Sequence, residues 1–193
     1  MKSLRSSLQE KIAFLKLKSG DTDAFAFFYD RYVKRIYRFV YIKVSSREIA
    51  EDLTQDIFLK VWQHLIDKKD IKSFQAFIFR IAYNTVADHY RRGNRQELPL
   101  DYFEETIEET ADNQAVSIGK KMDSALLLKQ LYQLKSEYRE ILLLRYVEDL
   151  SIEEIAQVIQ KDKNNVRVIL HRATSKLKEI NSGQSRTIGG KAA

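Results

Sequence analysis

The sequence predicts an all-α protein with two small helical domains joined by a flexible acidic linker. Apolar residues recur every three or four positions in both halves of the chain, which is the spacing of helices with one buried face. One proline and six glycines in 193 residues supply too few turns for a β sandwich. The segment between the halves holds seven carboxylates and no Lys or Arg, a composition typical of a linker. We expect domains at 8–95 and 120–181, the linker at 96–119 and a disordered tail at 182–193.

The composition narrows the class of protein. The formal net charge of +6 favours an anionic partner, nucleic acid above all. The absence of cysteine excludes disulfides and cysteine-ligated zinc. The longest apolar runs, such as Ile141–Leu144, are too short to span a bilayer, and Met1–Gly20 lacks the apolar core of a signal peptide. We therefore expect a cytoplasmic protein without membrane insertion.

Three helical segments are expected in the first domain. Helical periodicity runs through residues 25–36 and again through 49–65, where Ser46 is suited to be the N-cap. A lysine-rich break at 67–73 precedes a third segment over 74–92. The second segment also has a mainly polar stripe opposite its apolar one. Such a stripe is able to dock a partner helix, although a solvated face is the simpler alternative; its members are Asp52, Gln55, Asp56, Leu59 and Gln63.

The third segment combines basic, amide and aromatic side chains. Arg80, Asn84 and Arg91 fall on one face, beside Tyr83 and Tyr90. This mixture suits single-stranded nucleic acid, because cations follow phosphates and flat rings stack on unpaired bases. The alternative is that the aromatic rings, Phe79 included, belong to the core and the arginines are solvated.

The second domain ends in the pattern of a helix-turn-helix. Ser151 and Glu154 form a capping box ahead of the first helix, and Asp162 is a natural N-cap for the second. Asn and Arg side chains are suited to base edges, while Lys and Arg also bind phosphates. The alternative is an ordinary helix pair with a solvated basic face. The buried positions are predicted to be Ile152, Ile155, Ala156 and Ile159, then Val166, Leu170, Ala173 and Leu177; the outward ones are Lys163, Asn164, Asn165, Arg167, Val168, His171 and Arg172.

No catalytic or metal-binding pattern stands out. The acidic and histidine residues show no Glu-x-x-His or His-Glu-x-x-His spacing, and no glycine-rich phosphate loop is present. We therefore expect no enzyme activity, no metal and no cofactor.

Three blocks of the sequence, taken in order, resemble the bacterial extracytoplasmic-function (ECF) sigma factors of the sigma-70 family. They are residues 51–58 (EDLTQDIF), 73–92 (from Ser-Phe to RIAYNTVADHYRR) and 138–156 (from Tyr-Arg-Glu to LSIEEIA). The resemblance implies a region 2 domain and a region 4 domain on a flexible linker. It also implies a non-enzymatic subunit that recruits core RNA polymerase to a promoter, where region 2 recognises and helps to melt the −10 element and region 4 reads the −35 element.

The resemblance carries roles onto the first domain. It implies that Asp52, Gln55, Asp56 and Leu59 contact core polymerase. It also implies that the 67–73 loop takes up a flipped-out −10 base, at a cost that the loop and stacking rings must offset. The residues that it assigns to the melted −10 strand are Lys72, Ser73, Phe77, Arg80, Asn84, Arg91 and Arg92.

The resemblance assigns the second domain to duplex −35 DNA. Arg145 would contact a backbone phosphate, and the outward residues of the last helix would lie in the major groove. The acidic linker would follow the RNA-exit region of the polymerase, and an anti-sigma factor is implied as a further partner. The −35 set is Arg145, Lys163, Asn164, Asn165, Arg167, Val168, His171 and Arg172.

Three departures from the family pattern bear on the site. The turn reads Gln160-Lys161-Asp162 where the family usually has Gly-Ile/Val-Ser, so a residue with a Cβ stands where glycine tolerates positive φ. The last helix reads Val166-Arg167-Val168-Ile169 in place of Val-Lys/Arg-Ser-Arg, which offers Val168 to a thymine methyl group. Phe77 replaces a frequent tryptophan.

Three other functions fit parts of the sequence. A stand-alone helix-turn-helix regulator would leave the Asp52–Asp56 face and the Arg80–Asn84 face unexplained. A helical adaptor without a DNA role would bind without the steep salt dependence that phosphate contacts impose. A helical hydrolase lacks a recognisable site.

Overall fold

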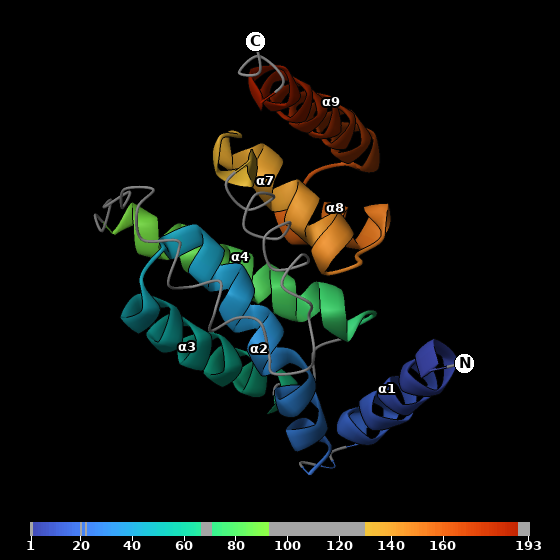
Figure 1. The fold of residues 1–193 in the computed structure, drawn as a ribbon. Coiled ribbons are helices and arrows are strands. Elements are labelled where there is room, and N and C mark those ends of the chain that lie inside the picture. The colour runs from blue at the N-terminus through green and yellow to red at the C-terminus, as the bar shows by residue number, and fades with distance from the viewer. Residues whose placement is uncertain (1, 20, 22, 67–70, 93–129, 189–193) are drawn as a thin grey trace. The chain divides into compact units, whose positions relative to one another are not determined.

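The computed structural model describes residues 2–19, 21, 23–66, 71–92 and 130–188, and all regular structure in these ranges is helical (Figure 1). The all-α fold expected from the sequence is therefore confirmed. The helices belong to two compact units, one formed by the helices before residue 97 and the other mainly by those after it. The predicted linker at 96–119 and most of the 67–73 loop lie outside the described residues.

The first unit contains helices α1 (Lys2–Lys18), α2 (Ala24–Val44), α3 (Arg47–Ile66) and α4 (Phe74–Arg91). Its core is largely aromatic. The rings of Phe28 and Phe74 lie 4.0 Å apart between centroids, and Phe14 of α1 contacts both of them edge-on. Burial of several large rings removes much apolar surface from water, so these contacts hold α1, α2 and α4 together.

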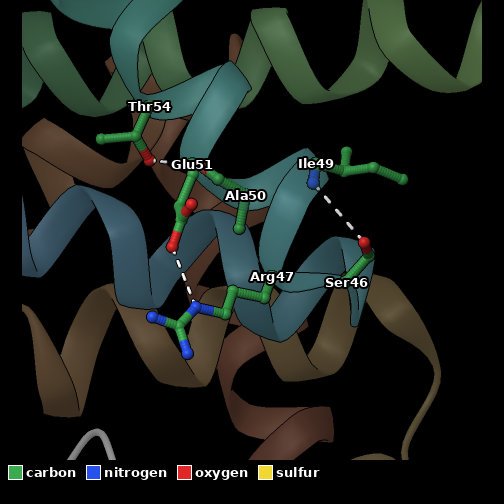
Figure 2. A network of polar contacts seen from close by, with 6 residues as sticks. All are labelled: Ser46, Arg47, Ile49, Ala50, Glu51 and Thr54. Carbon is green, nitrogen blue, oxygen red and sulfur yellow. Dashed lines mark hydrogen bonds and ion pairs between the residues drawn. The ribbon is translucent and has the colours of Figure 1, made fainter.

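The start of α3 is fixed by short-range polar contacts (Figure 2). Ser46 Oγ accepts a hydrogen bond from the Ile49 amide at 3.5 Å, which confirms the predicted N-cap. Arg47 Nε donates to Glu51 Oε1 at 3.0 Å, one turn along the exposed side. Thr54 is buried, and its hydroxyl donates to the Ala50 carbonyl at 2.6 Å. The core-facing stripe therefore includes Thr54, which periodicity of apolar residues alone does not reveal.

The second unit contains α7 (Ser136–Leu142), a π-helical turn η2 (Leu143–Val147), α8 (Ile152–Ile159) and α9 (Lys163–Ile188). Its core is aliphatic. Among its described residues, Leu144, Leu150, Ile155 and Val166 are fully buried. α7 packs against α9, so the aliphatic core lies under the helix-turn-helix.

Both predicted caps of the helix-turn-helix are present. Ser151 and Glu154 form the capping box, with the Glu154 amide 3.2 Å from Ser151 Oγ and the Ser151 amide 2.9 Å from Glu154 Oε2. Asp162 Oδ1 accepts from the Asn165 amide at 2.9 Å. These bonds satisfy amides that would otherwise lack partners at the helix starts.

The buried faces differ in detail from the prediction. In α8, Val158 is fully buried, whereas Ile152 and Ala156 are only half-buried. In α9, Ile169 is buried while Leu170 is half-buried. A one-residue difference in helical phase moves a side chain by about 100°, so the edge of an apolar face is the part that periodicity predicts least well.

Helix α9 continues to Ile188, beyond the predicted domain end at 181 and into the predicted tail. Gly and Ser in this part lower helix propensity by about 0.5–1 kcal/mol each. Extending an existing helix still gains one backbone hydrogen bond per residue, and Ser182 Oγ additionally donates to the Glu179 carbonyl. Residues 189–193 lie outside the described ranges.

Candidate nucleic-acid and polymerase interfaces

The polar stripe of α3 lies on one exposed face. Asp52, Gln55, Asp56 and Leu59 are all exposed, and the Leu59 side chain is 61% exposed. Asp56 Oδ2 forms an ion pair with Lys60 Nζ at 3.2 Å, one turn along. The face therefore combines carboxylates with an uncovered leucine, which suits a partner surface that is both basic and apolar.

The basic residues at the two ends of α4 and in its middle are exposed. Lys72, Arg80, Arg91 and Arg92 face solvent, and Asn84 is half-buried. Arg91 forms an ion pair with Asp88 on its own helix. These side chains form a broken row of cations with one amide along α4.

Two residues of the predicted −10 set contribute to the fold itself. Ser73 is the N-cap of α4, where its Oγ accepts from the Ala76 amide at 3.2 Å. Phe77 is buried at 6% exposure, with its ring 5.8 Å from the His64 ring. A ring in that position is part of the core and adds little to the exposed surface of α4.

The aromatic residues of α4 divide between core and surface. Phe79 is fully buried against Phe39, as the core alternative predicted. Tyr83 is half-buried beneath Lys43 Nζ, which lies 4.6 Å from the ring centroid. The Tyr90 hydroxyl donates to the Lys43 carbonyl and so joins the end of α4 to α2. Lys43 thus adds a cation from α2 beside α4, a neighbour that no sequence spacing indicates.

The first turns of α9 present a polar surface held by a buried opposite face. Val166 and Ala173 are fully buried, which fixes the rotation of the helix. Arg167 Nη1 donates to Asn164 Oδ1 at 2.9 Å, so these two side chains are pre-arranged together. The exposed residues are Lys163, Asn164, Asn165, Arg167, Val168, His171 and Arg172, with Val168 46% exposed.

The turn between α8 and α9 has the backbone conformation that usually requires glycine. Gln160 has φ 55° and ψ 44°, in the left-handed region. The Lys161 amide donates to the Ala156 carbonyl at 3.1 Å, which closes the end of α8 in the manner of a Schellman motif. A residue with a Cβ therefore adopts here the positive φ that glycine adopts freely.

A carboxylate contacts the start of the exposed α9 surface. Glu153 Oε1 lies 3.0 Å from Lys163 Nζ. The pKa of Glu153 is lowered from its ordinary value, chiefly because Lys163 donates a hydrogen bond to the carboxylate. The sequence pattern did not single out Glu153, because ten residues and a turn separate it from Lys163 and only the folded turn brings them together.

Arg145 lies in η2 and is half-buried. Its Nη1 donates to the Leu150 carbonyl at 2.8 Å. This bond uses one of the five N–H groups of the guanidinium, so it orients Arg145 while leaving others able to meet a phosphate. The arginine therefore links η2 to the start of the helix-turn-helix.

Within the described residues, no cluster of acidic and histidine side chains is suited to hold a metal ion. The search for membrane-crossing segments in the same residues finds no helix that is both long and apolar enough.

Comparison with protein families gives two matches in series. Residues 28–96 match the model of Sigma-70 region 2, and residues 124–177 match that of Sigma-70, region 4. A region 2 followed by a region 4 defines the sigma-70 class of transcription proteins.

Two curated relatives are ECF sigma factors. The ECF RNA polymerase sigma factor ShbA of Streptomyces griseus is 32% identical over 141 residues, which cover 70% of this chain and 73% of that protein. The ECF sigma factor BldN of Streptomyces coelicolor is 28% identical over 172 residues, covering 86% of this chain and 63% of BldN. The chain belongs to the ECF RNA polymerase sigma factors.

A solved structure shares the fold. The sigma factor RpoE of Bartonella quintana, crystallised with the anti-sigma factor NepR, aligns with a TM-score of 0.61 at 19% identity. The alignment covers 82% of this chain and 96% of that one.

Proposed function

We propose that this protein binds core RNA polymerase in the cytoplasm and directs transcription initiation at promoters with −10 and −35 elements, without being an enzyme itself. The observation that carries the proposal is the exposed start of α9. Asn164, Asn165 and Arg167 face solvent there, while Val166 and Ala173 anchor the opposite face. Asn and Arg side chains at the start of a recognition helix are suited to adenine and guanine edges in the major groove.

The first unit supplies the other two proposed surfaces. The exposed α3 face with Asp52, Gln55, Asp56 and Leu59 is proposed to bind core polymerase. The α4 row of Arg80, Asn84, Arg91 and Arg92, with Lys72, is proposed to follow the melted −10 strand. Its cations suit phosphates and Asn84 suits an unpaired base edge.

Further contacts support the −35 assignment. Arg145 is held by its bond to the Leu150 carbonyl in an orientation suited to one backbone phosphate. Val168, His171 and Arg172 continue the exposed side of α9, so the groove surface extends over about three turns. The half-exposed Val168 suits the methyl group of a thymine.

An anti-sigma factor is proposed as a further partner. RpoE of Bartonella quintana has the same fold and was solved with such a factor. An occluding partner would cover the surfaces that otherwise meet polymerase or DNA.

The proposal is tested by run-off transcription with core polymerase, a promoter library and sequencing of the start sites. We expect protein-dependent starts that share −10 and −35 elements. Asn84→Ala and Arg167→Ala should each weaken promoter use by about 1–3 kcal/mol, the usual worth of a good base contact. Ser175→Ala, at an exposed position later in α9, is the matched control. It should change neither the positions of the transcription starts nor the strength of promoter use.

One outcome would contradict the proposed function, and another would contradict the assignment of roles to individual residues. Salt-sensitive binding to duplex DNA without protein-dependent starts would identify a stand-alone regulator. Loss of starts in the Ser175→Ala control would show that the variants report on folding.

A further inference from the structure

An acidic side chain of α8 contacts the start of the proposed DNA surface, next to the capping carboxylate of Asp162. Glu153 is exposed in the first turn of α8, and its carboxylate lies 3.0 Å from the ammonium of Lys163, the first residue of α9. The two side chains are 51% and 54% exposed. The pair therefore faces the solvent that DNA would displace.

The helix ends explain why the pair forms. The positive end of a helix dipole disfavours a cation at the first residue and favours an anion in the first turn. Lys163 is the first residue of α9, where a cation is disfavoured, and Glu153 lies in the first turn of α8, where an anion is favoured. The carboxylate also carries a lowered pKa, for which hydrogen bonding by Lys163 is the largest cause, so it is ionised at neutral pH.

The second lysine of the turn is arranged in the same way. Lys161 Nζ lies 3.4 Å from Glu137 Oε1. Arg167, by contrast, bonds to the uncharged amide of Asn164. Both lysines that precede the base-reading residues thus pair with carboxylates, whereas Arg167 is oriented by a neutral partner and has only a weaker electrostatic interaction with Glu153.

The pairing changes what Lys163 gains from DNA. A lysine that moves to a phosphate releases a condensed counterion, which makes binding favourable at low salt. Lys163 already pairs with the Glu153 carboxylate. Moving to a phosphate therefore gains only the difference between the two ion-pair energies, and it leaves the Glu153 carboxylate beside that phosphate. Like charges at that distance repel.

We propose that Glu153 is a positioning residue that holds Lys163 away from DNA phosphates and thereby lowers the affinity of the −35 surface for duplex DNA of any sequence. The inference rests on the proposed DNA-reading role of α9. Binding then depends more on Asn164, Asn165 and Arg167, which meet base edges, than on phosphate attraction, which is alike for every sequence.

The test compares the full-length protein with its Glu153→Gln variant on a mixed-sequence duplex DNA over a range of NaCl concentrations. Glu153→Gln should tighten binding about threefold to tenfold at low salt and steepen the slope of log K against log salt by about 0.9, the value for one added phosphate contact. A residue with only a structural role would not change that slope.

The chain offers a matched control for net charge. Glu179 pairs with Lys176 at 2.7 Å on the same helix, sixteen residues after Lys163. Glu179→Gln adds the same charge but should leave the slope unchanged. Lys163→Gln combined with Glu153→Gln should abolish the gain, because the effect acts through Lys163.

The possible failures are distinguishable. An unchanged slope in Glu153→Gln, an equal change in Glu179→Gln, or no binding by either wild type or Glu153→Gln overturns this inference. Run-off transcription in parallel tests the proposed function: specific starts with an unchanged slope would leave the sigma role intact, whereas a steeper slope without starts would leave only the DNA contact.

Discussion

One tyrosine joins α1 to α2 through a buried hydroxyl. Tyr32 is fully buried, and its hydroxyl donates to a carboxylate oxygen of Glu10. The other oxygen of Glu10 forms an ion pair with Arg31 Nη2 at 3.0 Å. Burial, followed by the contact with Glu10, raises the pKa of Tyr32 well above its ordinary value. Tyr32 therefore remains protonated in the folded protein at pH values where a free tyrosine ionises.

This shift predicts a specific loss of stability in alkali. Because the folded pKa is raised, the contribution is complete below the unfolded pKa of about 10 and is lost progressively as the pH rises above it. Tyr32→Phe should cost about 1–2 kcal/mol at neutral pH, since Glu10 loses a donor, and should reduce the decline above pH of about 10. Urea unfolding from neutral to alkaline pH measures both effects.

Tyr146→Phe is the control, because Tyr146 is 65% exposed. Its free energy of unfolding should equal that of the wild type throughout the pH range. If the free energy of unfolding of the wild type and of Tyr32→Phe fell in parallel in alkali, the assignment of the loss to Tyr32 would be contradicted.

At the scale of an element, the turn of the helix-turn-helix keeps its shape with an unfavourable residue. Gln160 adopts φ 55°, a conformation that costs a residue with a Cβ about 1–2 kcal/mol. The amide of Lys161 and the cap at Asp162 hold the turn from both sides. These two hydrogen bonds thus fix a geometry that Gln160 does not itself favour.

Gln160→Gly should therefore stabilise the protein. We expect a gain of about 0.5–1 kcal/mol in the free energy of unfolding, after the extra freedom of glycine in the unfolded chain is counted. The same substitution at Gln157, an exposed position inside α8, should cost about 1 kcal/mol. Thermal unfolding of the two variants decides the point, and destabilisation by both would show that Gln160 is not strained.

The sequence predicts where helices begin better than it predicts where their winding departs from the α-helix. Ser46, Ser151 and Asp162 are recognisable caps because capping depends on residues three positions apart. The π-helical turn η2 has no such local signature, since it depends on how Ile141–Leu144 fit the core of the second unit.

The candidate sites follow the same division. The exposed residues of α3 and α9 follow from helical spacing along the chain. The Glu153–Lys163 pair and the position of Lys43 over Tyr83 need the folded backbone, because their members lie on different helices. The burial of Phe77 does not follow from helical spacing either, because an aromatic residue beside an apolar face fits the core or the surface of a helix.

At the scale of the whole molecule, the two units have cores built from different types of residue. The first is built from tilted and edge-on aromatic rings around Phe28 and Phe74. The described core of the second is aliphatic, with Leu144 and Ile155 at full burial. The chain's single tryptophan, Trp62, lies in the first unit with its ring 4.9 Å from Phe25. Its fluorescence therefore reports on that unit.

Separate cores predict separable unfolding. Ile57→Ala, at a fully buried position of α3, should lower the stability seen by Trp62 fluorescence by about 2–5 kcal/mol. Leu144→Ala, equally buried in the second unit, should leave the fluorescence transition in place and shift only part of the far-ultraviolet circular dichroism. A fluorescence transition that moves equally in both variants would show that the units unfold as one.

The π-helical turn places one additional residue in the segment that links α7 to the helix-turn-helix. Leu143 accepts from the Glu148 amide, five residues on, at 3.0 Å, where an α-helical turn would close after four. In ordinary α winding, one additional residue would rotate everything that follows by about 100°. The wider turn takes up that residue locally, so Ile141 and Leu142 keep their places in the core. The segment thus gains a residue beside Arg145 without turning α7 away from the helix-turn-helix.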